Sequence, residues 1–393
     1  MHLASILDRV AGLGSDKWRV HIRARQMMNR GEAVILLTIG EPDQPTPAEL
    51  VDAAHRAMRA GRTGYSSGRG EASVLKALAA KYSARSGRTI GSDQFIWVPG
   101  TQSALFLLLM ALVETGDEVI VADPCYATYH GLVRATGATT VPVALREARG
   151  FRLDADDVAR AVTPRTRVIF LNSPHNPTGA VLSRDDIRAI GEVAKAHDLW
   201  ILSDEVYESL VFAGSTFASP FDEADLAERT VVASSLSKSH AAPGFRAGWC
   251  AGSPAFIARL LPLAETMLFG AQPFIADMAA EALSRDFAIT AQMRDAYAAR
   301  ARHVAEALAG VPGLRVHPPQ AGMFVMLSVD GLGLDGEAFA FRLLDEEQVA
   351  VMPGAAFGDA AAGMVRLSLT VPDAALAEGC TRIAALARRL RVR

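Results

Sequence analysis

The 393-residue chain lacks the features that define several specialised classes of protein. Its three cysteines, Cys125, Cys250 and Cys380, are scattered, with neither a CxxC pair nor metal-ligand spacing. No disulfide framework and no metal site are therefore expected. The chain also lacks an excess of positive charge, because its formal net charge is −3. Nucleic acid is therefore not an expected partner.

Long hydrophobic runs are absent as well. The longest, residues 104–113, is about half of what a bilayer-spanning helix needs. Asp8 and Arg9 interrupt the segment in which a secretory signal would need an apolar core, so no export signal is expected. With 50% hydrophobic and 21% charged residues, the composition is that of a globular protein. We therefore expect a cytoplasmic protein that does not bind a membrane.

What the sequence does contain is a regular alternation of two patterns. Between about residues 95 and 251, short apolar runs alternate with longer helical stretches such as 103–113 and 184–197. Strands that alternate with crossover helices predict an α/β fold, with a mainly parallel sheet sandwiched between helices. In such sheets the ligand site lies at the carboxyl ends of the strands. The runs expected to be strands are 95–98, 118–122, 139–143, 167–171, 199–203, 230–234 and 247–251.

The pattern changes beyond about residue 290. A long helical stretch, 289–309, precedes a hairpin-like region at 322–329, and a final helix begins near Ala374. These features predict a smaller α+β domain. The helical stretch 18–30 is expected to join it, because 38–47 has the pattern of an extended crossover. The expected division is a large domain at 46–290 and a small domain made of 1–45 and 291–393.

Lys238 ends the sequence Ser-Ser-Leu-Ser-Lys at residues 234–238, directly after a predicted strand. Arg246 follows eight positions later. A lysine among small hydroxyl residues such as Ser235 suits an amine held ready to form a Schiff base, with hydroxyls and a guanidinium nearby to bind a phosphate. The alternative is an ordinary solvated lysine in a serine-rich loop.

Two further polar clusters follow predicted strands. Asn176 lies in Ser-Pro-His-Asn-Pro-Thr-Gly, a rigid turn that would fix an amide able to bind a phenolate-type oxygen; alternatively it is only a tight connection. Asp204 could pair with a protonated ring nitrogen, and Tyr207, three residues later, could donate to an oxygen of the same ring. The alternative for Asp204 is a cap of the next helix.

Phosphate and carboxylate sites are also indicated. Gly100, Thr101 and Gln102 open a predicted helix after the first strand, where backbone N–H groups bind phosphate well, although a plain helix start would look the same. The glycines of residues 64–70 do not fit GxGxxG, so a dinucleotide site is not expected. Arg366 lies within a predicted strand, where it could bind a carboxylate through two hydrogen bonds or simply be exposed.

Together, these segments resemble the class I, aspartate aminotransferase-like enzymes of the pyridoxal-phosphate fold type I superfamily, over nearly the whole chain and in the same order. The resemblance implies a transaminase of amino-acid metabolism with pyridoxal 5'-phosphate as cofactor. Lys238 would carry the cofactor as a Schiff base and move protons, and Asp204 would keep the ring nitrogen protonated. Tyr207 completes the implied catalytic set. The implied cofactor-binding residues are Lys238, Thr101, Gln102, Tyr126, Asn176, Asp204, Tyr207, Ser235, Arg246 and Tyr65.

The same resemblance implies partners. Tyr126 matches the aromatic ring that stacks on the pyridine face, and Tyr65 matches the tyrosine that crosses a dimer interface, which implies a homodimer with shared sites. The amino acid and 2-oxo acid substrates would be bound by Gly40, Asn176 and Arg366.

The substrates are less closely defined. Aspartate-specific relatives place a cation where this chain has Gln102, which argues against a strict dicarboxylate preference unless another arginine substitutes, for which the candidates are Arg23, Arg25 and Arg69. Short sequence segments such as Asn-Ser-Pro-His-Asn-Pro are similar to those of arginine–pyruvate transaminases. We expect a ping-pong transaminase that uses pyruvate or 2-oxoglutarate as acceptor.

Two other classes share parts of this pattern. A lyase that eliminates a β- or γ-substituent, including carbon–sulfur lyases, could use the same cofactor cage. A transcription regulator built on an aminotransferase domain would carry a DNA-binding module first, whereas here the aminotransferase-like pattern begins within the first few dozen residues.

Overall fold

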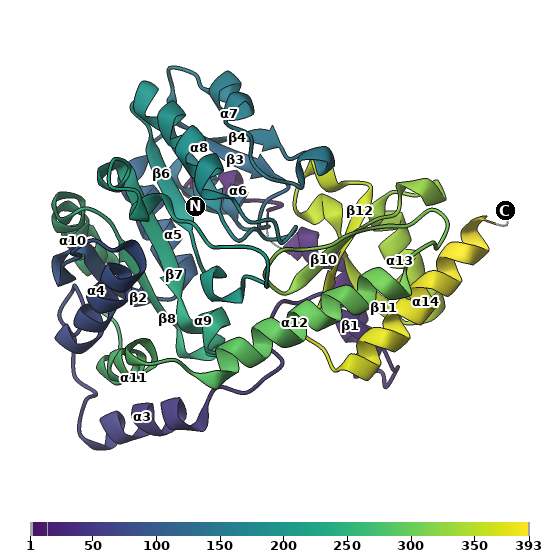
Figure 1. Ribbon diagram of the computed structural model, residues 1–393, viewed down its shortest axis with the longest axis horizontal. Helices are drawn as coiled ribbons and strands as arrows, with labels where there is room; N and C mark the ends of the chain where they lie inside the picture. Colours follow the sequence, from purple (N-terminus) through teal and green to yellow (C-terminus); the bar gives the residue numbers. More distant parts are fainter. Residues whose placement is uncertain (1–2, 14, 392–393) are drawn as a thin grey trace.

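In this computed structural model the protein contains two β-sheets, each with its own helices. The larger sheet lies at the left of Figure 1 and the smaller one at the right. The structure describes residues 3–13 and 15–391. Residues 1, 2, 14, 392 and 393, which fall within the range expected for the small domain, lie outside the described residues. Within the described part, no helix is long and apolar enough to cross a membrane.

The larger sheet has seven strands in the order β2-β8-β7-β6-β5-β3-β4. Strands β4, β3, β5, β6 and β7 are parallel, and β8 runs antiparallel to both of its neighbours. The mainly parallel α/β sheet is therefore confirmed. The strands are β2 (Phe95–Pro99), β3 (Glu118–Asp123), β4 (Thr139–Ala144), β5 (Thr166–Asn172), β6 (Trp200–Asp204), β7 (Thr230–Ser235) and β8 (Ala247–Ala251).

Helices cover both faces of this sheet because its buried strands are apolar on both sides. In β5, Val168 and Phe170 face one hydrophobic cluster while Ile169 and Leu171 face another, as the two-residue period of a strand requires. The first face is covered by α5 (Thr101–Leu112), α6 (Tyr129–Thr136) and α10 (Pro254–Leu268). The second is covered by α7 (Ala155–Ala161), α8 (Arg184–Ala196), α3 (Ala48–Arg59), α4 (Ala72–Ser86) and α11 (Pro273–Ser284).

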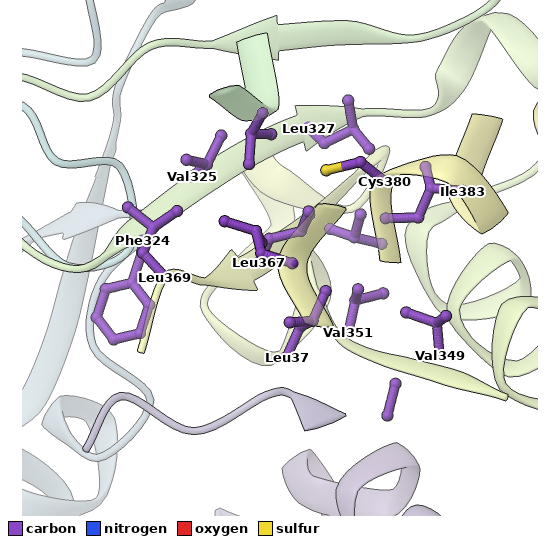
Figure 2. Close-up of a cluster of buried hydrophobic side chains, with 14 of the residues drawn as sticks. Leu37, Phe324, Val325, Leu327, Val349, Val351, Leu367, Leu369, Cys380 and Ile383 are labelled. Carbon is purple, nitrogen blue, oxygen red and sulfur yellow. The ribbon is translucent and has the colours of Figure 1, made fainter. Parts of the chain in front are cut away.

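The smaller sheet has five strands in the order β1-β11-β12-β10-β9. Its core, shown in Figure 2, joins side chains that are far apart in the sequence, such as Leu37, Val351 and Ile383. Phe324 lies at one edge of this cluster. The strands are β1 (Ile35–Leu37), β9 (Arg315–His317), β10 (Phe324–Ser328), β11 (Val349–Pro353) and β12 (Met364–Ser368).

The helices of the smaller sheet come from both ends of the chain. Residues of α2 (Arg19–Asn29), α12 (Ala288–Ala307), α13 (Gly336–Glu347) and α14 (Asp373–Arg391) contribute to its core. Helix α12 extends from the larger half across to the smaller half in Figure 1. Strand β1 has only three residues and pairs in parallel with β11, so the N-terminal segment contributes a strand as well as a helix. The two remaining α-helices of the described residues, α1 (Ile6–Arg9) and α9 (Leu236–Ser239), are short.

Candidate active site

A cavity of about 220 Å³ lies at the carboxyl ends of the parallel strands. It is the edge at which the sequence placed the ligand site, because Asn172, Asp204 and Ser235 each end a parallel strand and line this cavity. The predicted site residues that it brings together are Gly40, Thr101, Gln102, Tyr126, Asn176, Asp204, Tyr207, Ser235, Lys238, Arg246 and Arg366.

Tyr65 is the predicted site residue that does not line this cavity. Its side chain is 89% exposed, and its ring packs edge-on against Phe269, with 5.1 Å between the ring centroids. Phe269 is itself 67% exposed. Two neighbouring aromatic rings are thus presented to the outside of the chain.

Lys238 is held over the cavity by the short helix α9. Ser235 caps this helix, since its hydroxyl accepts from the backbone N–H of Ser237 at 3.3 Å. The Nζ atom of Lys238 donates to the carbonyl oxygen of Gly40 at 2.6 Å. Burial lowers the pKa of Lys238 to about 8, although the charge of Glu41 acts in the opposite direction. The amine is therefore easier to deprotonate than an ordinary lysine, as a nucleophile requires.

Asp204 presents a deeply buried carboxylate, only 4% exposed. Its Oδ2 accepts from the hydroxyl of Tyr129 at 2.7 Å, and its Oδ1 accepts from the backbone N–H of Val206 at 3.2 Å. Burial raises the pKa of Asp204 to about 6, while these donors and the charge of Lys238 lower it. No cationic side chain of the described residues hydrogen-bonds to this carboxylate, so it can still receive a cationic N–H group.

Tyr129 was not among the residues predicted from the sequence. The Tyr-x-x-Tyr spacing of Tyr126 and Tyr129 at the start of a helix was a weak signal. Only the fold shows that the second tyrosine points at a residue 75 positions away.

A chain of hydrogen bonds links the two sheets across the cavity. Arg366 donates from Nη1 to Oδ1 of Asn176 at 2.9 Å, and Asn176 donates from Nδ2 to the hydroxyl of Tyr207 at 3.3 Å. Asn172 fixes the turn, because its Oδ1 accepts from the backbone N–H of Asn176 at 2.9 Å. The amide of Asn176 and the hydroxyl of Tyr207 thus line the same cavity and are hydrogen-bonded to each other.

Arg366 is a buried cation, 2% exposed, without a carboxylate partner among the described residues. Its guanidinium lies between the rings of Phe324 and Phe357, at 3.8 and 4.4 Å from their centroids, and Nη2 donates to the carbonyl of Thr38 at 2.7 Å. Its Nε has no partner, and burial lowers the pKa of Arg366 to about 10. A buried cation is stable only when an anion neutralises it, so this group is suited to bind a ligand carboxylate.

Another group of residues that line the cavity suits a phosphate. Gly100 has a φ of 84°, and a Cβ at this position would overlap the guanidinium of Arg246, coming within 2.8 Å of Cζ. Helix α5 begins at Thr101, whose hydroxyl donates to Oγ of Ser235 at 2.9 Å. Arg246 is exposed and bonds only to the carbonyls of Pro243 and Pro99 among the described residues. A helix start, two hydroxyls and an unneutralised guanidinium fit the phosphate of the expected cofactor.

The arginines considered as substitutes for a cation at Gln102 lie elsewhere. None of Arg23, Arg25 and Arg69 lines the cavity. Arg23 forms an ion pair with Asp345 at 2.7 Å. The described cations that line the cavity are Lys238, Arg246 and Arg366.

Comparison with known proteins gives one consistent result. Residues 32–383 match the family described as aminotransferase class I and II. The chain is 44% identical over 390 residues to the arginine–pyruvate transaminase of Pseudomonas aeruginosa, covering 99% of each protein. It is 32% identical over 369 residues to the aspartate aminotransferase of Musicola paradisiaca, covering 93% of this chain and 92% of that protein.

Solved structures give the same result. The fold matches the aspartate aminotransferase from Thermus thermophilus with maleate, with a TM-score of 0.91 and 32% identity, over 98% of this chain and 100% of that one. It also matches the aspartate aminotransferase from Rhizobium meliloti, with a TM-score of 0.93 and 30% identity, over 99% of both chains.

Proposed function

The chain belongs to the class I and II aminotransferases, and from that premise we propose that it transfers an amino group from L-arginine to pyruvate with pyridoxal 5'-phosphate as cofactor. The observation that carries this proposal is the presence, in one cavity, of an amine with a lowered pKa and a buried guanidinium without an anionic partner. Lys238 provides the first group and Arg366 the second. Aminotransferases of this family are generally dependent on pyridoxal phosphate, and the donors around the cavity suit that molecule.

Each part of the cofactor finds a matching group. The phosphate would be held by Thr101, Gln102, Ser235 and Arg246. Asp204 would accept a hydrogen bond from the N–H group of the ring. Asn176 and Tyr207 would hydrogen-bond to the phenolic oxygen of the ring, and Tyr126 would contact the ring itself. When bound, the cofactor supplies an aldehyde that takes up the amino group and a ring that withdraws electrons from the substrate Cα.

The chain's own residues perform the remaining steps. Lys238 would hold the cofactor through its neutral amine, and its pKa near 8 would let it accept and return a proton at the substrate Cα. General acid–base catalysis of this kind contributes about 10²–10⁴-fold to the rate. Asp204, as an anion, would keep a proton on the ring nitrogen. Arg366 orients the substrate by its carboxylate, through two parallel hydrogen bonds.

The distribution of charge supports these substrates. Arg246 is assigned to the phosphate, Arg366 to the α-carboxylate and Lys238 to the chemistry, so no cation of the described cavity lining remains for a second carboxylate. This favours pyruvate over 2-oxoglutarate, and arginine over aspartate. Trp18, at the end of the turn Ser15–Trp18, also lines the cavity and offers an aromatic face to a cationic side chain.

A competition between substrates tests the proposal. The purified protein is assayed with arginine, alanine and aspartate as donors against pyruvate and 2-oxoglutarate. We expect the highest kcat/KM with arginine and pyruvate; a higher value for aspartate with 2-oxoglutarate would refute the substrate assignment. Release of ammonia and pyruvate from a donor without any acceptor would indicate a lyase instead.

A chemical label tests the covalent role. Borohydride reduction of the protein loaded with cofactor, followed by peptide mapping, should place the label on Lys238, and Lys238→Ala should abolish both the label and the activity. A label at another lysine would refute the assignment. Lys81→Ala is a suitable comparison, because Lys81 pairs with Glu208 away from the cavity and its loss should leave the label in place.

The exposed aromatic pair supports a homodimer in which Tyr65 reaches the neighbouring active site. Large exposed apolar groups mark interaction surfaces, and Tyr65 and Phe269 line one hollow on the outside of the chain. Mixing of Tyr65→Ala with Lys238→Ala tests this arrangement. Each hybrid would contain one site with both groups intact, so the mixture should be more active than the mean of the two variants. Additive activity would refute the sharing of sites.

A further inference from the structure

The hydrogen bond between Tyr129 and Asp204 joins two groups that are almost completely removed from solvent. Tyr129 is 2% exposed and Asp204 is 4% exposed, and the O···O distance is 2.7 Å. The ring of Tyr129 stacks on Phe170, at 4.2 Å between centroids and 27° between planes, and meets Tyr126 edge-on at 5.6 Å. The phenol cannot turn away, because its ring is fixed on two sides.

We propose that Tyr129 is a positioning residue that keeps Asp204 ionised and aimed at the ring nitrogen of the bound cofactor. This inference rests on the proposed function, since it requires pyridoxal phosphate to be bound through Asp204. The hydroxyl of Tyr129, which donates to Oδ2, stabilises the carboxylate anion against the effect of burial, and the protonated ring needs this anion.

The physical reason is the competition between burial and hydrogen bonding. Removal from water favours the neutral acid, and only donors or positive charges restore the anion. Two hydrogen bonds do so here, one from the hydroxyl of Tyr129 to Oδ2 and one from the N–H of Val206 to Oδ1. Without the hydroxyl, Oδ2 would have no hydrogen-bond partner within the described part of the protein. Asp204 would then stay protonated to higher pH, and it could no longer accept a hydrogen bond from a protonated ring nitrogen.

The other ionisable groups around this pair do not replace the phenol. Tyr126 and Tyr207 stay neutral because burial raises the pKa of each, and burial likewise raises the pKa of Cys125. On α6 itself, burial lowers the pKa of His130, so this ring is neutral near pH 7. Lys238 is the cation that acts on Asp204, and it becomes part of the covalent linkage when the cofactor binds.

Tyr129→Phe removes the hydroxyl and keeps the ring. We expect the cofactor dissociation constant to rise about tenfold to hundredfold, the value of a hydrogen bond to a charged group. The acid limb of the pH profile of kcat/KM should move to higher pH. In ¹⁵N NMR of protein loaded with ring-labelled cofactor, the pyridine nitrogen should lose its proton at lower pH than in the parent protein.

Tyr82→Phe is the matched control. Tyr82 is 0% exposed, packs edge-on against Phe95 and accepts from Nε1 of Trp249 at 2.8 Å, but it does not line the cavity. Its loss should lower stability and leave the ¹⁵N titration unchanged. A double variant with Asp204→Asn provides a second measurement, because Tyr129→Phe should have almost no additional effect on cofactor affinity once the carboxylate is gone.

The outcomes separate the two proposals. If borohydride labels Lys238 in the parent protein but Tyr129→Phe leaves the ¹⁵N titration and the cofactor affinity unchanged, the role of Tyr129 is refuted while the proposed function stands. If the parent protein shows no label at Lys238, the proposed function fails first. A change in stability alone, equal to that of Tyr82→Phe, would also overturn the inference.

Discussion

Replacement of Asp204 by asparagine is expected to stabilise the cofactor-free protein at neutral pH while it abolishes activity. Burial raises the pKa of this carboxyl from 3.8 to about 6. A difference of about two units, at about 1.4 kcal/mol each, corresponds to about 3 kcal/mol of unfavourable free energy for holding the anion in the folded state. Asparagine has only one oxygen to accept the two hydrogen bonds that Tyr129 and Val206 donate to Asp204. The loss of one of them reduces the gain in stability by about 1 kcal/mol. The net gain is therefore about 2 kcal/mol.

The pH dependence identifies the cause. The folded protein binds a proton at Asp204 more tightly than the unfolded chain does, so this group favours folding below about pH 4. That contribution is lost as the pH rises from about 4 to about 6 and stays lost above it. The advantage of Asp204→Asn should consequently be absent near pH 4 and complete by pH 7.

Urea unfolding of both cofactor-free proteins at several pH values between 4 and 7.5 measures this difference. Other titrating groups occur in both proteins and cancel. Asp154→Asn serves as a control, because the contribution of Asp154 to stability should depend on pH in the opposite direction. The N–H groups at the start of α7, together with Arg149, outweigh desolvation and lower the pKa of Asp154, so its contribution is lost as the pH falls. An equal effect of Asp204→Asn at every pH, or a loss of stability at pH 7.5, would refute the reasoning.

Three more substitutions follow from the geometry. Arg366→Lys keeps the charge but loses the planar pair of donors, so KM for both substrates should rise about tenfold or more with a smaller change in kcat, as steady-state kinetics would show. Gly100→Ala should weaken cofactor binding about tenfold in fluorescence titrations, because the added Cβ would overlap Arg246. Gly116→Ala is the control and should leave the affinity unchanged, because Gly116 also has a positive φ but has open space around it. Burial raises the pKa of Glu205 from 4.5 to about 7, so stability should fall as the pH rises from about 4.5 to about 7, and Glu205→Gln should flatten that fall in thermal melts. A parallel pH dependence in parent and variant would contradict the last expectation.

The sequence was most informative where chemistry follows directly on a strand. Asp204 and Ser235 end β6 and β7, and Lys238 lies three residues beyond, so the strand pattern alone placed them at one edge. Arg366 was singled out because an arginine within a strand could bind a carboxylate through two hydrogen bonds, and the structure buries it at the cavity instead of exposing it. The assignments of Gly40 and Tyr126 depended on the family resemblance.

Other features depend on contacts that no local pattern encodes. The bond from Tyr129 to Asp204 joins residues 75 positions apart, and the place of Trp18 at the cavity depends on how the N-terminal segment folds back. Strand β1 is too short to show a period. The reversed direction of β8 leaves no signature in its composition, because a strand buried on both faces has the same apolar pattern in either direction.

In the proposed function, the carboxylate of the substrate would be bound by one half of the molecule, and its amino group would react with the cofactor held by the other half. Arg366 belongs to the five-stranded sheet and Lys238 to the segment after β7 of the seven-stranded one, and Asn176 ties the guanidinium to the larger half. The distance between the Arg366 guanidinium and the cofactor held beside Lys238 would thereby be set by how the two halves are joined, and this distance would limit the separation between the carboxylate and the amino group of a substrate. In a β-amino acid the carboxylate and the amino group are one carbon farther apart. Such a compound should therefore be unable to bind Arg366 and place its amino group at the cofactor at the same time.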